Sequence, residues 1–232
     1  MMSDLAAVYR RKTEKEHVLE NPDTYCGSME VTEYRTGVLS DCGTKIQVES
    51  VNIIPGLYKL FDEAIVNARD HHARMLLVPD DLQVTSIEVE IRDDGWWSFR
   101  NNGPGIPVAQ HPEYKLWIPE LIFANLRTSS NYSKTAKKRT GGKNGLGITL
   151  AFIWSLKGRI TTVDATRKLK YTQEYNNNLG EKSSPVVKPC SSAPFTLVEF
   201  LPDYQRLGIS SPSREMISLL KRRVYDIAAI TA

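Results

Sequence analysis

The chain has 232 residues and a formal net charge of +3; 41% of the residues are hydrophobic and 25% are charged. This size and apolar content allow one large domain or two small ones, with a core that needs no metal or disulfide. The small net charge gives no argument for nucleic-acid binding from charge alone. The three cysteines form no Cys-x-x-Cys pair and have no histidines at zinc spacing, so we expect free thiols in a reducing compartment. No stretch reaches the roughly 18 apolar residues of a membrane span, and the N-terminus has no hydrophobic signal core.

Polar and charged residues dominate positions 1–24, where we expect an arm or at most a short helix. Hydrophobic alternation and helical periodicity predict the following elements in chain order: strands within 31–53 around a turn at 41–43, a helix over 57–77, a hairpin of strands 84–91 and 96–100, helices over 117–126 and 145–156, strands near 159–164, 169–175 and 195–200, and a helix over 213–230 with Ser213 as its N-cap. Residues 127–144 predict a long loop, which in a compact domain is usually functional or disordered. The mix is α/β or α+β, and the hairpins favour a largely antiparallel sheet with helices on one face.

Residues 140–152, TGGKNGLGITLAF, join a glycine-rich turn to the start of an apolar run. One explanation is a phosphate, because a helix N-terminus offers unpaired backbone N–H groups and glycines let an anion approach closely. The other explanation is a turn that leads into a buried helix. The spacing matches neither the Walker loop nor the dinucleotide fingerprint, so this stretch alone leaves both explanations open.

The helix predicted after Pro55 has a polar group beside its apolar stripe. Glu63, Asn67 and Asp70 fall together on one face at helical spacing. The simplest explanation is the solvated flank of a surface helix. A carboxylate and an amide one turn apart can also hold a water and a metal ion side by side, because the carboxylate accepts a proton and the amide oxygen suits Mg²⁺. The apolar stripe consists of Leu57, Leu60, Phe61, Ala64, Ile65 and Ala68.

Two further polar segments have both a structural and a functional explanation. Residues 100–108, RNNGPGIPV, form either a tight turn or a bare backbone for a flat ring, whose edge Asn101 or Asn102 would read. Residues 126–132, LRTSSNY, form either a helix end with a polar loop or a set of small side chains that hold ribose or phosphates. Each segment is a weak signal when it is taken alone.

The order of these segments is more specific than any one of them. The sequence resembles the ATPase domain of eukaryotic-type DNA topoisomerase II, which belongs to the superfamily of gyrase, heat-shock chaperone, histidine kinase and mismatch-repair ATPases. The resemblance covers nearly the whole chain. It rests on segments in family order: YRRKTEKEHVLENPDTYCGSME, GLYKLFDEAIVNARD, NNGPGIPV, IPELIFANLRTSSNY, TGGKNGLG, FTLVEFLPD and KRRVYDIAAIT.

The resemblance implies an α+β fold of the Bergerat type, a two-layer sandwich in which helices cover one face of a mixed, largely antiparallel sheet. It implies an N-terminal arm over residues 1–24 that straps a dimer together, followed by an ATP-binding domain over residues 25–232. It also implies ATP and Mg²⁺ as cofactors, and a homodimer that closes on ATP binding.

The resemblance assigns roles to individual residues. Glu63 would be the general base that activates the attacking water, and Asn67 would ligate Mg²⁺. Asn101 would contact the adenine with Thr196 behind the base, and Tyr9 would reach the nucleotide of the dimer partner. Ribose and phosphates would be contacted by Ser129, Ser130 and Asn131. The triphosphate would be wrapped by Gly142, Lys143, Asn144, Gly145, Leu146, Gly147, Ile148 and Thr149.

The resemblance further implies a type IIA topoisomerase, in which ATP closes a dimer gate so that one DNA duplex passes through another. DNA would be a partner through the full-length enzyme, no membrane would be involved, and the location would be nuclear, or cytoplasmic for a viral enzyme. We expect this chain to bind ATP, and we expect full turnover only in a dimer with the family's next domain and its lysine.

Two departures from the family pattern affect the phosphate end of the site. Residues 145–150 are Gly-Leu-Gly-Ile-Thr-Leu where the family commonly has Gly-Tyr-Gly-Ala-Lys-Leu, so Thr149 replaces a lysine and Lys143 is a candidate to offset it. The segment after Asn131, SKTAKKR, is basic where the family is commonly acidic, which fits a solvated lid or a contact to phosphate or DNA.

Two alternatives to a topoisomerase remain at this point. A chaperone-like or mismatch-repair ATPase of the same superfamily would lack the opening segment and the Ser-Ser-Asn triplet. A non-catalytic nucleotide- or DNA-binding module would not need Glu63, because binding alone requires no general base.

Overall fold

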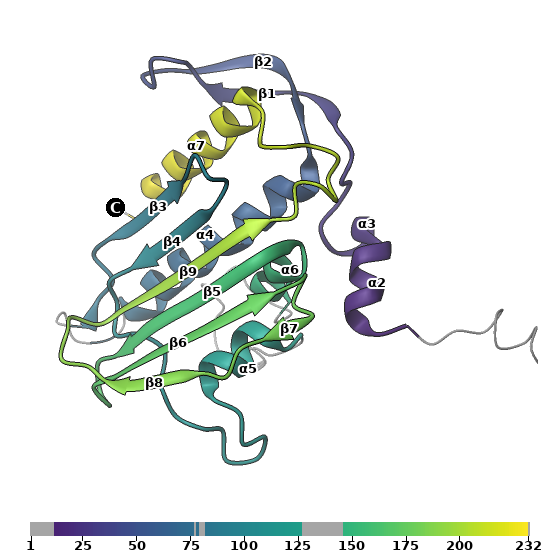
Figure 1. Ribbon diagram of the computed structural model, residues 1–232. Coiled ribbons are helices and arrows are strands. Elements are labelled where there is room, and N and C mark those ends of the chain that lie inside the picture. The colour runs from purple at the N-terminus through teal and green to yellow at the C-terminus, as the bar shows by residue number, and fades with distance from the viewer. Residues whose placement is uncertain (1–11, 77, 79–81, 127–145, 232) are drawn as a thin grey trace, which may run out of the picture.

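A computed structural model describes residues 12–76, 78, 82–126 and 146–231 of the chain. Figure 1 shows two layers, a large twisted sheet with helices packed behind it. The helices are α2 (Glu14–Glu20), α3 (Pro22–Tyr25), α4 (Pro55–Met75), α5 (Ile118–Ala124), α6 (Gly147–Ile153) and α7 (Arg214–Ala229). The arrangement confirms the predicted α+β sandwich.

The sheet has seven strands in the order β3-β4-β9-β5-β6-β7, and β8 also pairs with β6. All described pairings are antiparallel, so this part of the chain shows no mixed pairing. Its strands are β3 (Ile87–Ile91), β4 (Trp97–Asn101), β5 (Ser155–Asp164), β6 (Leu169–Asn176), β7 (Glu181–Lys182), β8 (Val186–Pro189) and β9 (Phe195–Pro202).

A separate hairpin of β1 (Thr32–Leu39) and β2 (Ile46–Ile53) stands against α7, the yellow helix of Figure 1. Ser213 caps α7 as predicted, because its hydroxyl accepts a hydrogen bond from the Met216 amide at 3.0 Å. Arg222 of α7 donates to the Gly37 carbonyl at 2.7 Å, and Ser218 donates to the Leu39 carbonyl. These bonds satisfy carbonyls of β1 that no neighbouring strand reaches.

The bounds of α6 and two short strands differ from the predicted elements. Helix α6 covers residues 147–153 rather than 145–156, because Ser155 already begins β5. Every side chain from 148 to 153 is buried, and a fully buried apolar run has no periodicity that separates a helix from a strand. Helix α2 instead agrees with the short helix expected within residues 1–24, and it starts with a capping box between Thr13 and Glu16. The short edge strands β7 and β8 were not predicted.

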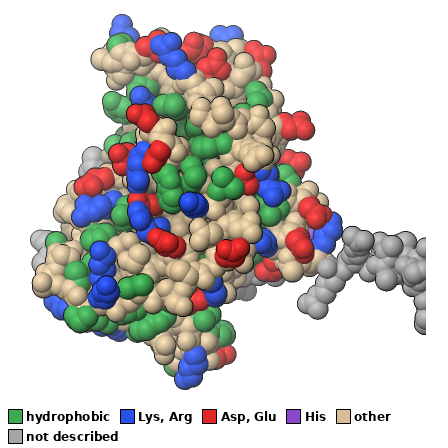
Figure 2. All heavy atoms as spheres, in the orientation of Figure 1, with side chains coloured by type: hydrophobic (Ala, Val, Ile, Leu, Met, Phe, Trp, Pro, Cys, Tyr) green, Lys and Arg blue, Asp and Glu red, His purple; other side chains and the backbone are tan. Residues whose placement is uncertain are grey.

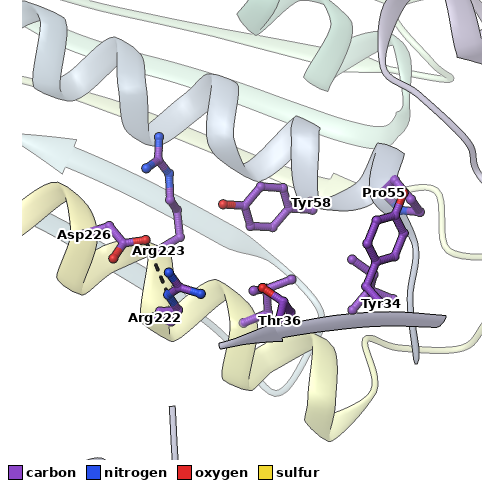
Figure 3. Close-up of a pocket in the computed structure, with 9 residues that line it drawn as sticks. Tyr34, Thr36, Pro55, Tyr58, Arg222, Arg223 and Asp226 are labelled. Atoms are coloured by element: carbon purple, nitrogen blue, oxygen red, sulfur yellow. Dashed lines mark ion pairs between the residues drawn. The ribbon is translucent and has the colours of Figure 1, made fainter. Parts of the chain in front are cut away.

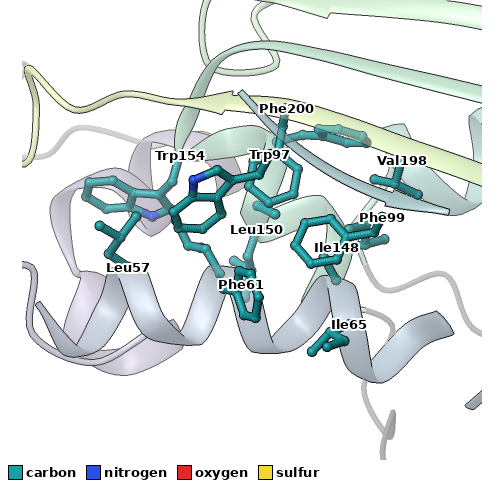
Figure 4. Close-up of a cluster of buried hydrophobic side chains, with 14 of the residues drawn as sticks. Leu57, Phe61, Ile65, Trp97, Phe99, Ile148, Leu150, Trp154, Val198 and Phe200 are labelled. Carbon is teal, nitrogen blue, oxygen red and sulfur yellow. The ribbon is translucent and has the colours of Figure 1, made fainter. Parts of the chain in front are cut away.

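The core lies between α4, α6 and the sheet, where aromatic rings from four elements meet (Figure 4). Phe61 of α4 packs edge-on to Trp97 and Phe99 of β4, with ring centroids 5.5 and 5.1 Å away. Phe200 of β9 contacts both β4 rings and the Phe152 ring of α6. All six predicted stripe residues of α4 are buried, so its periodicity reported the core face correctly.

The opposite face of the sheet carries several ion pairs. Figure 2 shows acidic and basic side chains interspersed over this face. Glu199 of β9 pairs with Arg159 at 2.7 Å and also with Arg92, and Glu88 pairs with Arg100 at 3.1 Å. Side chains alternate between the two faces along β9, so Glu199 lies on the face with the ion pairs while Val198 and Phe200 lie on the face toward the helices.

Phe200→Ala is expected to lower the free energy of unfolding by about 3–5 kcal/mol, because it removes a fully buried ring that joins three elements. Val48→Ala is the matched control, since Val48 is 65% exposed and should cost within about 0.5 kcal/mol. Urea unfolding followed by circular dichroism measures both variants. Equal losses would contradict this description of the core.

Candidate functional site

Helix α4 presents Glu63 and Asn67 one turn apart. The Asn67 amide nitrogen donates to the Glu63 backbone carbonyl at 2.8 Å, so the amide oxygen stays available as a ligand. The Glu63 side chain is 21% exposed and pairs with Lys59. Asp70 was expected on the same polar face, but its side chain is buried, and Arg69 lies 3.4 Å from its carboxylate.

Glu63 also lies directly against the start of α6. A Cβ atom placed on Gly147 would be 1.7 Å from the Glu63 Oε2 and 2.6 Å from its Cδ. Only a glycine allows the carboxylate to lie so close to the backbone at this position. The structure therefore brings together two predicted site elements that are 84 residues apart in the sequence, the acid of α4 and the glycine motif that opens α6.

The side chains that follow Gly147 point into the protein. Ile148 is 7% exposed and Thr149 is 1% exposed, and the Thr149 hydroxyl lies 3.5 Å from the Ile122 carbonyl of α5. The Thr149 side chain therefore cannot replace the family lysine at a phosphate, and the prediction for these two positions is restricted to their backbone N–H groups. The reason is that both side chains are buried against the core, so neither can reach a ligand at the surface.

A row of polar side chains crosses three strands at the other end of the site. Asn101 of β4 pairs in register with Thr196 of β9, which pairs with Thr162 of β5. The two threonine hydroxyls are 3.2 Å apart, and all three side chains are buried. Buried polar groups are stable only with partners, so this row is a built feature of the sheet.

His71 of α4 completes this row and was missed by sequence reasoning. Its Nδ1 lies 2.9 Å from the Asn101 Oδ1. Burial lowers the pKa of His71, against the opposing effect of the hydrogen bond to Asn101. The available signal was its position one helical turn after Asn67, in a series with Glu63.

The two neighbouring asparagines, Asn101 and Asn102, have different partners. The Asn102 side-chain oxygen accepts from the Thr85 and Ser86 amides at 2.9 Å, and its amide nitrogen donates to the Thr85 hydroxyl. Asn102 therefore holds the segment that leads into β3, whereas the Asn101 side chain contacts His71. Close packing explains why glycines follow at positions 103 and 105. A Cβ atom on Gly103 would strike Val84 and His71, and one on Gly105 would strike the Val163 carbonyl.

Asp164 fastens this glycine loop to the sheet. Its carboxylate accepts from the Val108 amide at 2.8 Å and from the Thr166 amide at 2.9 Å, and Arg167 pairs with it at 3.1 Å. Burial by itself raises the pKa of Asp164, but the hydrogen bonds from Val108, Arg167 and Thr166 outweigh it, so the pKa lies below its usual value.

Several predicted site residues lie outside the described residues. They are Tyr9, Ser129, Ser130, Asn131, Gly142, Lys143, Asn144, Gly145 and the basic segment 134–139. Their roles stay predictions.

Two cavities lie away from the predicted site. The larger, about 390 Å³, opens between the β1–β2 hairpin, α4 and α7 (Figure 3). Its arginines already have protein partners: Arg222 pairs with Asp226 at 3.7 Å, and Arg223 pairs with Asp62 at 2.7 Å. The second, about 270 Å³, lies between α4, β3 and the end of α7. Both belong to the packing of α7.

Asp164→Asn is expected to cost about 1.5–3 kcal/mol near pH 7, because an amide nitrogen cannot accept the hydrogen bonds that the carboxylate accepts. Since the folded pKa is lowered, this stabilisation is present above the unfolded pKa of about 3.9 and is lost as pH falls through the folded pKa. The difference between the two proteins should therefore shrink below about pH 4.

Urea unfolding between pH 2.5 and 7 measures this difference. Asp93→Asn, in the exposed turn between β3 and β4, is the matched control and should change stability by less than about 0.5 kcal/mol. A loss for Asp164→Asn that does not change with pH would contradict the assignment.

Comparisons with known proteins agree with this geometry. The family model described as histidine kinase-, DNA gyrase B-, and HSP90-like ATPase matches residues 52–185. The DNA topoisomerase 2 of Acanthamoeba polyphaga mimivirus is 37% identical over 96% of this chain, and that of Pisum sativum is 40% identical over 95%. These matches cover 18% and 15% of the relatives, so the chain spans less than a fifth of their length.

Solved structures give the same result. The ATPase region of Saccharomyces cerevisiae topoisomerase II superposes with a TM-score of 0.90 at 36% identity, covering 96% of this chain and 58% of that one. The ATPase and transducer domains of DNA topoisomerase II from Balamuthia mandrillaris superpose with a TM-score of 0.89 at 35% identity, covering 96% and 57%. The chain therefore belongs to the histidine kinase-, DNA gyrase B- and HSP90-like ATPase family, as an ATPase domain of the DNA topoisomerase II type.

Proposed function

We propose that this domain binds ATP with Mg²⁺ and hydrolyses it to drive closure of a dimer gate in a type IIA DNA topoisomerase. The observation that carries the proposal is the contact between the Glu63 carboxylate and Gly147 at the start of α6, with Asn67 one turn further along α4. A module that only senses nucleotide would have no need for a carboxylate at this place. The topoisomerase relatives favour this function over a chaperone-like or mismatch-repair ATPase.

The nucleotide would lie between the two ends of the site. The adenine is proposed to contact Asn101 with Thr196 behind it. The ribose and phosphates are assigned to Ser129, Ser130 and Asn131, and the triphosphate is assigned to residues 142–149. The buried side chains of Ile148 and Thr149 leave only backbone N–H groups for the phosphates at those positions.

Glu63 is proposed to accept the proton of the attacking water, a role that a positioned carboxylate can perform. The Asn67 side-chain oxygen is a hard ligand that fits Mg²⁺, since its amide nitrogen is held by the helix backbone. When bound, Mg²⁺ neutralises the charge of the phosphates during transfer. Positioning and charge, rather than covalent chemistry, are what this site would supply.

The partners follow from the topoisomerase assignment. The N-terminal arm, residues 1–24 with Tyr9, is proposed to cross to the nucleotide of a second copy, and DNA would be bound by the full-length enzyme. Val18 of α2 is fully buried in the core, which anchors the described part of this arm to its own domain. Within the described residues, no helix is long and apolar enough to cross a membrane. We propose a nuclear location, or a cytoplasmic one for a viral enzyme.

Asn67→Ala and Glu63→Gln are expected to separate binding from hydrolysis. Asn67→Ala should abolish the Mg²⁺-dependent part of binding to a non-hydrolysable ATP analogue, because the metal loses a protein ligand. Glu63→Gln should retain binding and slow phosphate release by about 10²–10⁴-fold, since an amide cannot accept the proton. Calorimetry and a phosphate-release assay measure the two effects.

Glu88→Gln is the matched control, because Glu88 lies on the opposite face of the sheet, where it pairs with Arg100. It should bind and hydrolyse ATP like the wild type. If the well-folded wild type bound no ATP analogue with Mg²⁺, the proposed function would be wrong for this chain.

Gly147→Ala tests the contact that carries the proposal. The added methyl group would have to displace the Glu63 carboxylate, and a catalytic group misplaced by about 1 Å can cost about 10²-fold in rate. Gly208→Ala is the control for backbone strain, because Gly208 has φ +68° and open space around it. Phosphate release should fall only for Gly147→Ala, and equal rates in both variants would remove Glu63 from the mechanism.

A further inference from the structure

His71 and Asn101 come from different layers of the fold and meet at the end proposed for the base. His71 lies on α4, Asn101 ends β4, and their Nδ1 and Oδ1 atoms are 2.9 Å apart. The imidazole is held in place from behind, because a Cβ on Gly103 would lie 2.8 Å from its Cε1. The Gly103 backbone therefore packs against the imidazole that makes this contact.

The chemistry of the two groups sets the direction of the hydrogen bond. An amide oxygen only accepts, so His71 donates from Nδ1. Burial lowers the pKa of His71, which favours the neutral ring, and the hydrogen bond to the Asn101 oxygen places its proton on Nδ1. The Asn101 Nδ2 has no hydrogen-bond partner among the described residues, although its side chain is 5% exposed. One end of the amide is thus satisfied by the protein, and the other end is left for a ligand.

A side-chain amide presents an acceptor and a donor side by side, and the two purines need opposite orientations of it. Adenine offers its N6 amino donor beside the N1 acceptor. Guanine offers its O6 acceptor beside the N1–H donor. A rotation of the Asn101 amide by 180° would therefore change its complement from one purine to the other, unless a neighbour fixes the oxygen.

We propose that His71 is the residue that determines base specificity, by fixing the Asn101 amide in the orientation complementary to adenine. The amide oxygen has a second lone pair for the adenine amino group, and the unpartnered Nδ2 donates to the ring nitrogen. This inference rests on the proposed function, since it places the base against Asn101. His71 acts through Asn101 and is a positioning residue rather than a catalytic one.

The test compares the affinities of non-hydrolysable ATP and GTP analogues, with Mg²⁺, for the wild-type chain and its variants. His71→Ala and His71→Leu both remove the donor, and the leucine retains much of the volume. Each should reduce the preference for ATP over GTP by about ten-fold, the effect of one hydrogen bond. His71→Asn should restore the preference to within about three-fold, because its amide nitrogen is placed at the same distance along the side chain as Nδ1.

Asn101→Asp provides a background in which His71 should no longer affect the choice of base. A carboxylate has two equivalent oxygens and no orientation to fix, so adding His71→Ala should leave the ATP-to-GTP preference unchanged there. A merely structural role for His71 would instead change the preference equally in both backgrounds. Thermal unfolding of each variant reports its folding separately from its base preference.

Three results would overturn the inference. They are an unchanged ATP preference in both His71→Ala and His71→Leu, a loss of preference that persists in the Asn101→Asp background, or no recovery in His71→Asn. A wild-type chain that binds neither analogue would overturn the proposed function and this inference together. A wild type that prefers ATP while the variants lose nothing would overturn the inference alone.

Discussion

The packing of α4 across the sheet and α6 is the constraint on which the rest of the structure depends. Leu57, Leu60, Phe61 and Ile65 bury one side of this helix, and each large apolar side chain contributes about 1.5–3 kcal/mol. The same packing sets the rotation of the helix about its axis. It thereby directs Glu63 to the start of α6 and His71 to the end of β4. The two ends of the proposed nucleotide site are thus positioned by one rigid element.

Close backbone approach is the second requirement of the site. Gly147 admits the Glu63 carboxylate, and Gly103 and Gly105 admit His71 and the Val163 carbonyl. Asp164 then holds the loop after these glycines through the Val108 amide. Glycines in such segments suggest contact with a ligand, but in the described part of the chain they serve contacts within the protein. Their effect on a ligand is indirect, because they place the groups that would touch it.

The sequence predicted the long α4, the hairpins and the antiparallel sheet, because their periodicities of 3.6 and 2 follow directly from one buried face. Helical spacing paired Glu63 with Asn67, and the family resemblance added Asn101 and Thr196 to the predicted site. The roles of these residues stay predictions. The predicted end of α6 was wrong, because a fully buried run has no hydrophobic periodicity that marks where a helix stops. The expectation that Asp70 shares a solvated face with Glu63 and Asn67 was wrong, because helical spacing shows which residues share a face and does not show what covers it.

The sequence by itself therefore determined the elements, the core stripe and the family, since these depend on local pattern and on the order of motifs. Only the tertiary structure decided how individual polar groups are used. Asn102 holds the segment that leads into β3 while Asn101 contacts His71, the Thr149 hydroxyl turns toward α5, and His71 joins the polar row of the sheet. The physical reason is that each hydrogen bond joins elements distant in the chain, and a pattern within one segment contains no information about a partner in another.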